Sequence, residues 1–161
     1  MKRAFEISEA YDTPVMLRLV TRVAHARSLV QPGPRQKIEL KPYEKDPAKY
    51  VMMAGIARAR HVVVEQREDK LQEDLSALGL NSVEYNDKSI GVVCSGSAYN
   101  NVKEALPNAS VLKLGMVYPL DEKTIREFAA NVQTLYVVEE LEPFFEDAIK
   151  AIGIPVAAGK N

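Results

Sequence analysis

Residues 90–114 read IGVVCSGSAYNNVKEALPNASVLKL, and this stretch decides the fold. It opens with an apolar run (IGVVC, 90–94), passes through small residues into a helical pattern, and ends in a second apolar run (SVLKL, 110–114). Short, nearly continuous apolar runs are typical of strands that are buried on both faces of a sheet. A strand, a helix and a strand in this order predict two parallel strands joined by a right-handed crossover.

The same alternation continues to the C-terminus. Asp121 fits the cap position of one helical pattern, and Gly153 fits the end of another. The apolar runs at 90–94, 110–114 and 135–138 should be neighbouring parallel strands. The short run at 82–85 should pair antiparallel with the nearby run at 90–94, at an edge of the sheet. The expected fold is therefore α/β, with three layers and a mainly parallel sheet. The remaining predicted elements are strands at 82–85, 135–138 and 154–157 and helices at 121–132 and 143–152.

The chain ahead of residue 81 divides into two further regions. Residues 1–30 begin with a helical pattern and contain TPVMLRLV (13–20), which predicts a fully buried parallel strand. Residues 31–80 begin as a proline-rich linker with a short extended piece predicted at 37–40. The third region, residues 81–161, is the α/β domain.

A long helical pattern follows the linker. Asp46 and Pro47 form a helix-start signal, and the apolar periodicity runs to Leu78, with Gly79 in the position of a C-terminal cap. Gly55 and the β-branched residues 62–64 weaken the pattern, so a break at either place remains open. We expect a helical arm.

Composition excludes several classes of function. The chain has 21 Lys and Arg against 22 Asp and Glu, so we expect no nucleic-acid or anionic-membrane partner. One cysteine, Cys94, and two histidines, His25 and His61, cannot supply an iron–sulfur cluster or a zinc site. The N-terminus lacks the apolar core of a signal peptide, and no run is long enough to span a membrane, so a cytoplasmic location is expected.

Two candidate sites follow predicted strands. Ser95, Gly96 and Ser97 lie between a buried strand and a helix, where α/β proteins often bind ligands, although neither phosphate-loop fingerprint is present. A simple strand-to-helix turn is the alternative. Glu139 and Glu140 follow residues 135–138, where they would act as acid and base, cap the next helix, or pair at an interface.

Other reactive residue types have weaker support. Arg22 and His25 follow the strand predicted at 13–20, and they would contact a carboxylate or phosphate or would simply lie in a surface loop. Cys94 ends an apolar run, so packing is expected of it rather than nucleophilic chemistry.

Several phrases of the chain, in one order, resemble the alpha subunit of indolepyruvate ferredoxin oxidoreductases. Residues 91–120 (GVVCSGSAYNNVKEALPNASVLKLGMVYPL) and 135–147 (LYVVEELEPFFED) resemble its transketolase C-terminal-like domain. Residues 10–28 (AYDTPVMLRLVTRVAHARS) resemble the end of its pyrimidine-binding domain, and residues 46–61 (DPAKYVMMAGIARARH) resemble the connector between the two. In that connector, Ala54 and Gly55 stand where the family often has Pro and Asn.

The resemblance implies a thiamine diphosphate-dependent, iron–sulfur enzyme that oxidatively decarboxylates aryl pyruvates to acyl-CoA and reduces ferredoxin. It implies magnesium and [4Fe-4S] clusters as further cofactors, and the remainder of the alpha subunit, a beta subunit, ferredoxin and coenzyme A as partners. The family's GDG motif, which holds magnesium and diphosphate, does not occur in this sequence. The chain is therefore expected to be an internal fragment that binds no cofactor and has no catalytic residue of its own.

Three hypotheses about function remain at this point. The first is a structural and interface domain of such an oxidoreductase. The second is a stand-alone, flavodoxin-like domain that binds a small ligand or nucleotide at the turn of residues 95–97. The third is an oligomerisation module built on the long helix. In addition, residues 13–20 would be an exposed strand edge if the rest of their sheet were missing, so self-association through them is a further hypothesis.

Overall fold

The computed structural model describes residues 2–35 and 37–158, which belong to two compact units, residues 1–67 and 68–161. The N-terminal unit is helical in its regular parts. Long helix α4 begins in it and ends in the C-terminal unit. Within residues 2–35 and 37–78, the regular elements are α1 (Lys2–Tyr11), α2 (Thr21–His25), α3 (Pro47–Tyr50) and α4 (Ala54–Leu78).

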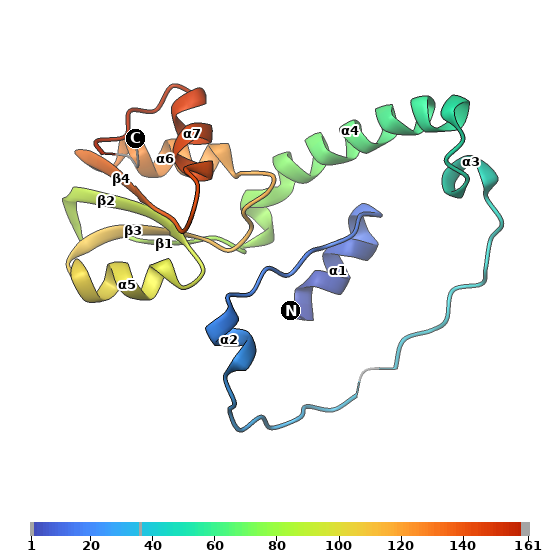
Figure 1. Cartoon of the computed structure of the whole chain (residues 1–161), viewed down its shortest axis with the longest axis horizontal. Coiled ribbons are helices and arrows are strands. Elements are labelled where there is room, and N and C mark those ends of the chain that lie inside the picture. Colours follow the sequence, from blue (N-terminus) through green and yellow to red (C-terminus); the bar gives the residue numbers. More distant parts are fainter. Residues whose placement is uncertain (1, 36, 159–161) are drawn as a thin grey trace. The chain divides into compact units, whose positions relative to one another are not determined.

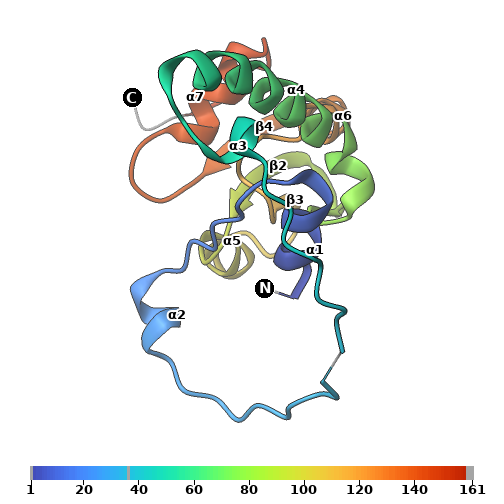
Figure 2. The same cartoon turned by 90° about the vertical axis from the view of Figure 1, so that its right-hand side faces the viewer.

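The strand predicted at 13–20 is wrong. Residues 13–20 have no regular structure, and no strand occurs among the described residues of the N-terminal unit with which they could pair. A strand needs a hydrogen-bonded neighbour, so apolar character alone does not form one. The described residues between α2 and α3 have no regular structure and follow an extended path (Figure 2), and this path includes the short extended piece predicted at 37–40. Met16 and Leu19 are consequently exposed.

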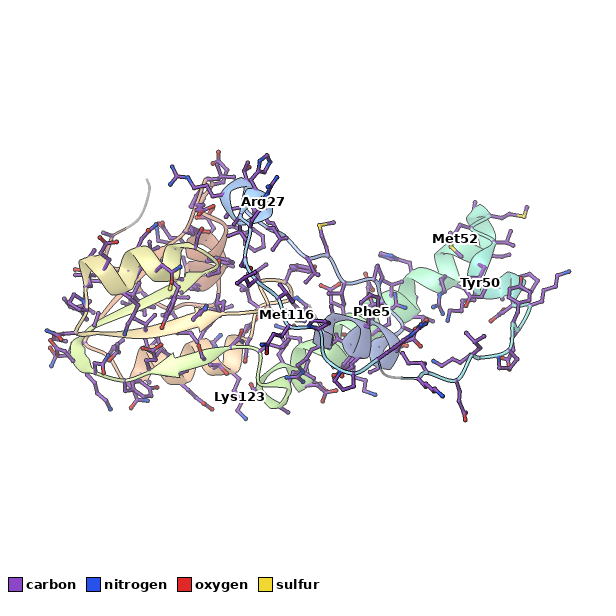
Figure 3. The ribbon with its side chains drawn as sticks, turned by 90° about the horizontal axis from the view of Figure 1, so that it is seen from below. Phe5, Arg27, Tyr50, Met52, Met116 and Lys123 are labelled. Carbon is purple, nitrogen blue, oxygen red and sulfur yellow. The ribbon has the colours of Figure 1, made fainter. Side chains whose placement is uncertain are left out.

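The helix predicted from Asp46 begins where expected but is not continuous. Asp46 Oδ1 accepts a hydrogen bond of 3.2 Å from Lys49 N and so caps α3, which ends after one turn at Tyr50. Residues 51–53 then interrupt the helix before α4 starts. The break therefore falls ahead of Gly55 and residues 62–64, the weak points noted in the sequence. Tyr50 and Met52, labelled in Figure 3, are both exposed here.

Asp12 organises the N-terminal unit. Its carboxylate accepts hydrogen bonds from Lys49 Nζ at 2.7 Å and from Arg60 Nη2 at 3.2 Å, and Arg67 Nη1 lies 3.4 Å from it. Asp12 has a positive φ of 49°, a conformation that Asp adopts more readily than most residues. The hydrogen bond from Lys49, with the charges of Lys49 and the two arginines, holds the pKa of Asp12 below its ordinary value. One carboxylate thus links α1 to α3 and α4.

The C-terminal unit is the α/β domain. The predicted parallel neighbours are confirmed, because β2 pairs parallel with both β3 and β4 in a sheet of order β1-β3-β2-β4. β1 is antiparallel and at the edge, as expected, but its partner is β3 and not β2. Both sides of β2 are already occupied, by β3 and β4, so β1 cannot pair with β2 and instead extends the sheet beyond β3. The elements are β1 (Ser82–Glu84), β2 (Asp87–Ser95), α5 (Ala98–Ala105), β3 (Ala109–Leu114), α6 (Glu122–Ala130), β4 (Thr134–Val138) and α7 (Phe144–Ala151).

The sheet has helices on both faces, which confirms the expected three layers. α5 lies on one side, and α6 and α7 lie on the other (Figure 1). Side chains alternate accordingly along β2. Val92 and Cys94 pack with Val102 of α5, whereas Val93 packs with Phe128 of α6 and with the buried side chains of α7. Because both faces of the sheet are covered, each central strand is apolar at nearly every position.

The edges of this domain show how closely its backbone is packed. The strand predicted at 154–157 is absent, since Pro155 has no N–H to donate, and only one bond links this segment to the sheet, from Ala157 N to Leu135 O at 2.8 Å.

Gly115 follows β3, and a Cβ placed on it would lie 2.1 Å from the Leu80 carbonyl oxygen. Only glycine fits there.

Candidate functional site

The carboxyl ends of β2 and β4 meet at one edge of the sheet and bring two groups of predicted site residues together. The strands are parallel neighbours, and Cys94 pairs with Val138 at their ends. Ser95 ends β2, and the chain then turns through Gly96, which has a positive φ of 53°. This conformation is the one in which glycine is favoured.

Ser97 and Glu140 are in direct contact across this edge. Ser97 Oγ donates a hydrogen bond of 2.5 Å to Glu140 Oε1. Ser97 stands at the N-cap of α5, but its side chain makes no capping hydrogen bond. The turn of residues 95–97 is therefore joined to the segment after β4, and an exposed carboxylate lies beside it.

Glu139 has a different partner. Its Oε2 accepts a hydrogen bond from Phe145 N at 2.9 Å, and its Oε1 accepts one from Glu146 N at 3.0 Å. These N–H groups belong to the first turn of α7, where a carboxylate is favoured because the amides there have no partner inside the helix. Glu139 therefore caps α7, while Glu140 holds the turn before α5.

Arg22 and His25 lie on α2 in the N-terminal unit, and both are exposed. They lie at the surface, as one of the two interpretations expected, but on a short helix, Thr21–His25, and not in a loop. Residues three apart on a helix share a face, so this pair lies on one side of α2.

Cys94 is fully buried, and burial raises the pKa of its thiol to about 11. A thiol is nucleophilic only as the thiolate, so Cys94 has the properties of a packing residue. Its packing partners Val102 and Ala98 belong to α5.

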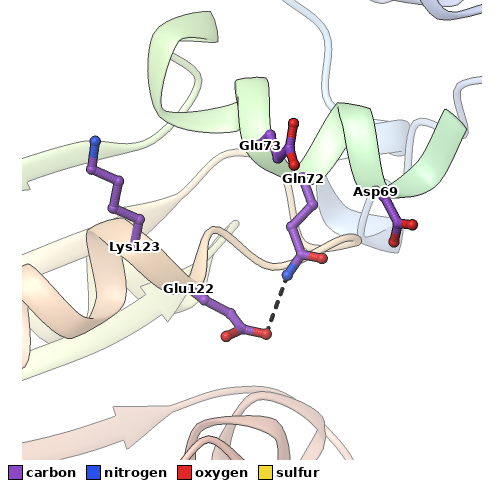
Figure 4. Close-up of a pocket in the computed structure, with 5 residues that line it drawn as sticks. All are labelled: Asp69, Gln72, Glu73, Glu122 and Lys123. Atoms are coloured by element: carbon purple, nitrogen blue, oxygen red, sulfur yellow. Dashed lines mark hydrogen bonds between the residues drawn. The ribbon is translucent and has the colours of Figure 1, made fainter. Parts of the chain in front are cut away.

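An open pocket of about 520 Å³ lies beside the start of α6, and its lining is three acidic side chains with one glutamine and one lysine (Figure 4), namely Asp69, Glu73, Glu122, Gln72 and Lys123. Gln72 Nε2 donates a hydrogen bond of 3.2 Å to Glu122 Oε1 at this pocket.

Across residues 2–35 and 37–158, no group of three or more His, Cys, Asp or Glu is arranged to hold a metal ion. None of the described helices has the length and apolar character needed to cross a bilayer.

Comparison with known proteins shows which proteins this chain is similar to. The chain is 36% identical over 159 residues to "Indolepyruvate oxidoreductase subunit IorA" of Methanothermobacter thermautotrophicus, covering 94% of the chain and 26% of the relative. The chain is similar to a segment of IorA. The IorA of Archaeoglobus fulgidus is 31% identical over 165 residues (99% of the chain, 26% of the relative), and that of Pyrococcus horikoshii is 33% identical over 162 residues (93% and 25%).

The chain thus spans about a quarter of the length of the IorA relatives it matches. No model of a protein family matches it. Among solved structures, a 2-oxoglutarate:ferredoxin oxidoreductase from Magnetococcus marinus, with 2-oxoglutarate, coenzyme A and succinyl-CoA bound, aligns with 62% of the chain and 19% of its own. The TM-score is 0.48 and the sequence identity is 17%.

The structure also shows a residue at this edge that the sequence patterns did not indicate. Leu141 follows Glu140, has a positive φ of 63°, and exposes 75% of its surface. Glycine and asparagine are the residues that signal a left-handed turn, so the letters EELEP give no sign of one. Its sequence position, directly after Glu139 and Glu140, places it at the carboxyl end of β4.

Proposed function

We propose that this chain is a structural and interface domain of a thiamine diphosphate-dependent indolepyruvate ferredoxin oxidoreductase. The observation that carries the proposal is the match to IorA from one end of the chain almost to the other, at 31% to 36% identity. The reaction proposed for the parent enzyme is the oxidative decarboxylation of indolepyruvate and related aryl pyruvates to acyl-CoA, with electrons passed to ferredoxin.

The proposed domain boundaries follow the resemblance. Residues 1–30 would be the end of a pyrimidine-binding-type domain, residues 31–80 the linker and arm, and residues 81–161 the transketolase C-terminal-like domain. The exposed apolar side chains of residues 13–20 fit this proposal, because the end of a larger domain is buried only when the rest of that domain is present.

Within the parent enzyme, the proposed role of Glu139, Glu140 and Cys94 is structural. Glu139 is engaged by the amides of α7, and Glu140 by Ser97. Cys94 is buried, with a raised pKa. These contacts support a domain that contributes no acid, base or nucleophile and whose Glu139–Glu140 pair acts in assembly.

The cofactors would be held elsewhere in the parent enzyme. Thiamine diphosphate supplies the electron sink for decarboxylation, and the iron–sulfur clusters carry the electrons. The proposed partners are the remainder of the alpha subunit, a beta subunit, ferredoxin and coenzyme A. The proposed location is the cytoplasm.

The alternative of a stand-alone nucleotide-binding domain has less support from the geometry. A phosphate at the turn of residues 95–97 would lie next to the Glu140 carboxylate, which already accepts the Ser97 hydrogen bond. The negative charges of the phosphate and of the Glu140 carboxylate would repel each other, so the turn is poorly suited to binding an anion.

Two measurements test the proposal. The first is calorimetric titration of the 161-residue chain with thiamine diphosphate and magnesium, followed by an assay with indolepyruvate, coenzyme A and a dye acceptor; we expect neither binding nor turnover. The second is the same assay on the parent enzyme with all its subunits, for which we expect turnover. Stoichiometric cofactor binding by the chain alone would overturn the non-catalytic role. A parent enzyme that is inactive on every aryl pyruvate would overturn the reaction.

A further inference from the structure

The loop that leads from β4 into α7 (Figure 1) holds a leucine in an unfavourable position. Leu141 is in the left-handed backbone region, which its Cβ disfavours, and it exposes 75% of its surface. An exposed leucine buries little apolar area, and a glycine or asparagine would adopt the same backbone with less strain. The stability of the domain therefore gives no reason for a leucine at this position.

The backbone around Leu141 is held on both sides. Glu140 accepts the hydrogen bond from Ser97, and the Glu139 carboxylate accepts two from the first turn of α7. Phe145 is buried in the core below. Phe144, beside it, is 52% exposed, so Leu141 and Phe144 present apolar surface from a fixed loop. Preorganised apolar anchors are typical of protein–protein interfaces.

The charged residues nearest these anchors in the sequence are all acidic. Residues 139–147 contain five Asp and Glu and no Lys or Arg. Glu139 caps α7 and the buried Glu146 pairs with Lys150, so the exposed carboxylates of this segment are those of Glu140, Glu142 and Asp147. The whole of residues 68–161 has fifteen Asp and Glu against eight Lys and Arg, a net charge of −7. A partner that fits this surface must therefore provide cations around an apolar recess.

We propose that residues 140–144, the carboxyl-edge loop, are a docking surface for another protein subunit, with Leu141 as the anchor and Phe144 as its apolar neighbour. The partner surface is an apolar recess bordered by Lys and Arg side chains. Glu140 and Glu142 face those cations and set the orientation of docking. The assignment of the partner as a further subunit of the oxidoreductase rests on the proposed function.

The test replaces Leu141 in two settings. In the 161-residue chain, Leu141→Asn is expected to raise the midpoint of thermal unfolding by a few degrees, since asparagine tolerates the left-handed backbone. In the parent enzyme, the same substitution is expected to weaken subunit association at least tenfold by analytical ultracentrifugation. Association of the unsubstituted enzyme should also weaken as salt rises from 50 to 300 mM, because exposed charges are screened. The matched control is Leu106→Asn, which changes an exposed leucine after α5 and should alter neither association nor its salt dependence.

Each outcome decides a separate point. Unchanged association of the Leu141→Asn enzyme overturns the docking surface, and so does a lowered unfolding midpoint, which would make Leu141 a packing residue. If the 161-residue chain itself forms dimers that Leu141→Asn abolishes, the occupant is a second copy and the assigned partner is wrong. If the parent enzyme does not oxidise aryl pyruvates but still loses its subunit on substitution, the proposed function fails and the docking surface stands.

Discussion

The Ser76 hydroxyl donates a hydrogen bond of 2.9 Å to Asp121 Oδ1 and so ties the last turns of α4 to the start of α6. The same carboxylate accepts hydrogen bonds from Asn81 Nδ2 at 3.2 Å and from Thr124 N at 3.0 Å. Asp121 is almost fully buried, with 2% of its surface exposed. A buried carboxylate is stable only when such donors surround it, and here they come from three separate segments.

We expect Asp121→Asn to reduce the free energy of unfolding by about 2–3 kcal/mol, because the uncharged amide leaves donors unsatisfied and weakens those that remain. Urea denaturation measures the change. Glu104→Gln, which removes an exposed carboxylate from α5, is the matched control and should change stability by less than about 0.5 kcal/mol. Equal effects of the two substitutions would show that the Asp121 contacts contribute nothing.

The same residue makes stability depend on pH. Burial raises the pKa of Asp121, but hydrogen bonds from Thr124, Ser76 and Asn81 outweigh burial and hold the pKa below its ordinary value. Its contribution is therefore fully present above the pKa of unfolded Asp, about 3.9, and is lost as pH falls through the folded pKa. The stability difference between the wild-type chain and Asp121→Asn should accordingly shrink below about pH 4. A difference that stays constant from pH 6 to pH 3 would contradict this.

Cys94 should be almost inert towards thiol reagents in the folded chain. With a pKa of about 11, only about one thiol in a thousand is ionised at pH 8, and the side chain is fully buried. Labelling with Ellman's reagent at pH 8 should therefore be slow in buffer and complete within seconds to minutes in guanidinium chloride. Rapid labelling of the folded chain would show that β2 and α5 separate readily.

Gly115 should tolerate no side chain. In Gly115→Ala, the new Cβ would collide with the Leu80 carbonyl oxygen, and the backbone must move, at a cost of at least about 2 kcal/mol. Gly55→Ala is the matched control, since a Cβ there meets no atom within 4 Å and the position is helical. Thermal unfolding should show a large loss for the first variant and no loss for the second.

Local features of this chain were predictable from its sequence. Asp121 was expected as a cap, and the structure confirms this because capping depends on groups only three residues away. The central strands were expected as parallel neighbours for the same kind of reason, since apolar runs joined by helices leave few arrangements. Partners that lie far apart in sequence were not predictable. Nothing near residues 13–20 indicates that the described residues of the N-terminal unit offer them no strand to pair with, and nothing near Asp12 indicates its three cations.

The candidate site was predicted in its position but not in its contacts. The strand ends indicated residues 95–97 and 139–140, and adjacency of β2 and β4 brings Ser97 to Glu140. The choice between Glu139 and Glu140 as the cap of α7 depends on the conformation of the loop. That conformation includes Leu141 in the left-handed region, and a leucine in the sequence does not predict a left-handed turn. The net charge of the whole chain, −1, also conceals an uneven distribution, because residues 1–67 alone have a net charge of +6. The expectation that nucleic acid and membrane are not partners rested on that sum and stays a prediction.

The pairing of β1 with β3 sets an order on folding. Ser82 pairs with Lys113. The chain between β1 and β3, which contains β2 and α5, must therefore close as a loop before β1 gains its first partner. Closing that longer loop loses more chain entropy than a hairpin with β2 would. β2, α5 and β3 would therefore assemble first, and β1 would dock late, with Leu80 reaching Gly115 in the same step. A refolding experiment should find β1 unstructured in the transition state, with φ-values near zero for substitutions at Val83 and higher values for those at Val92 and Val111.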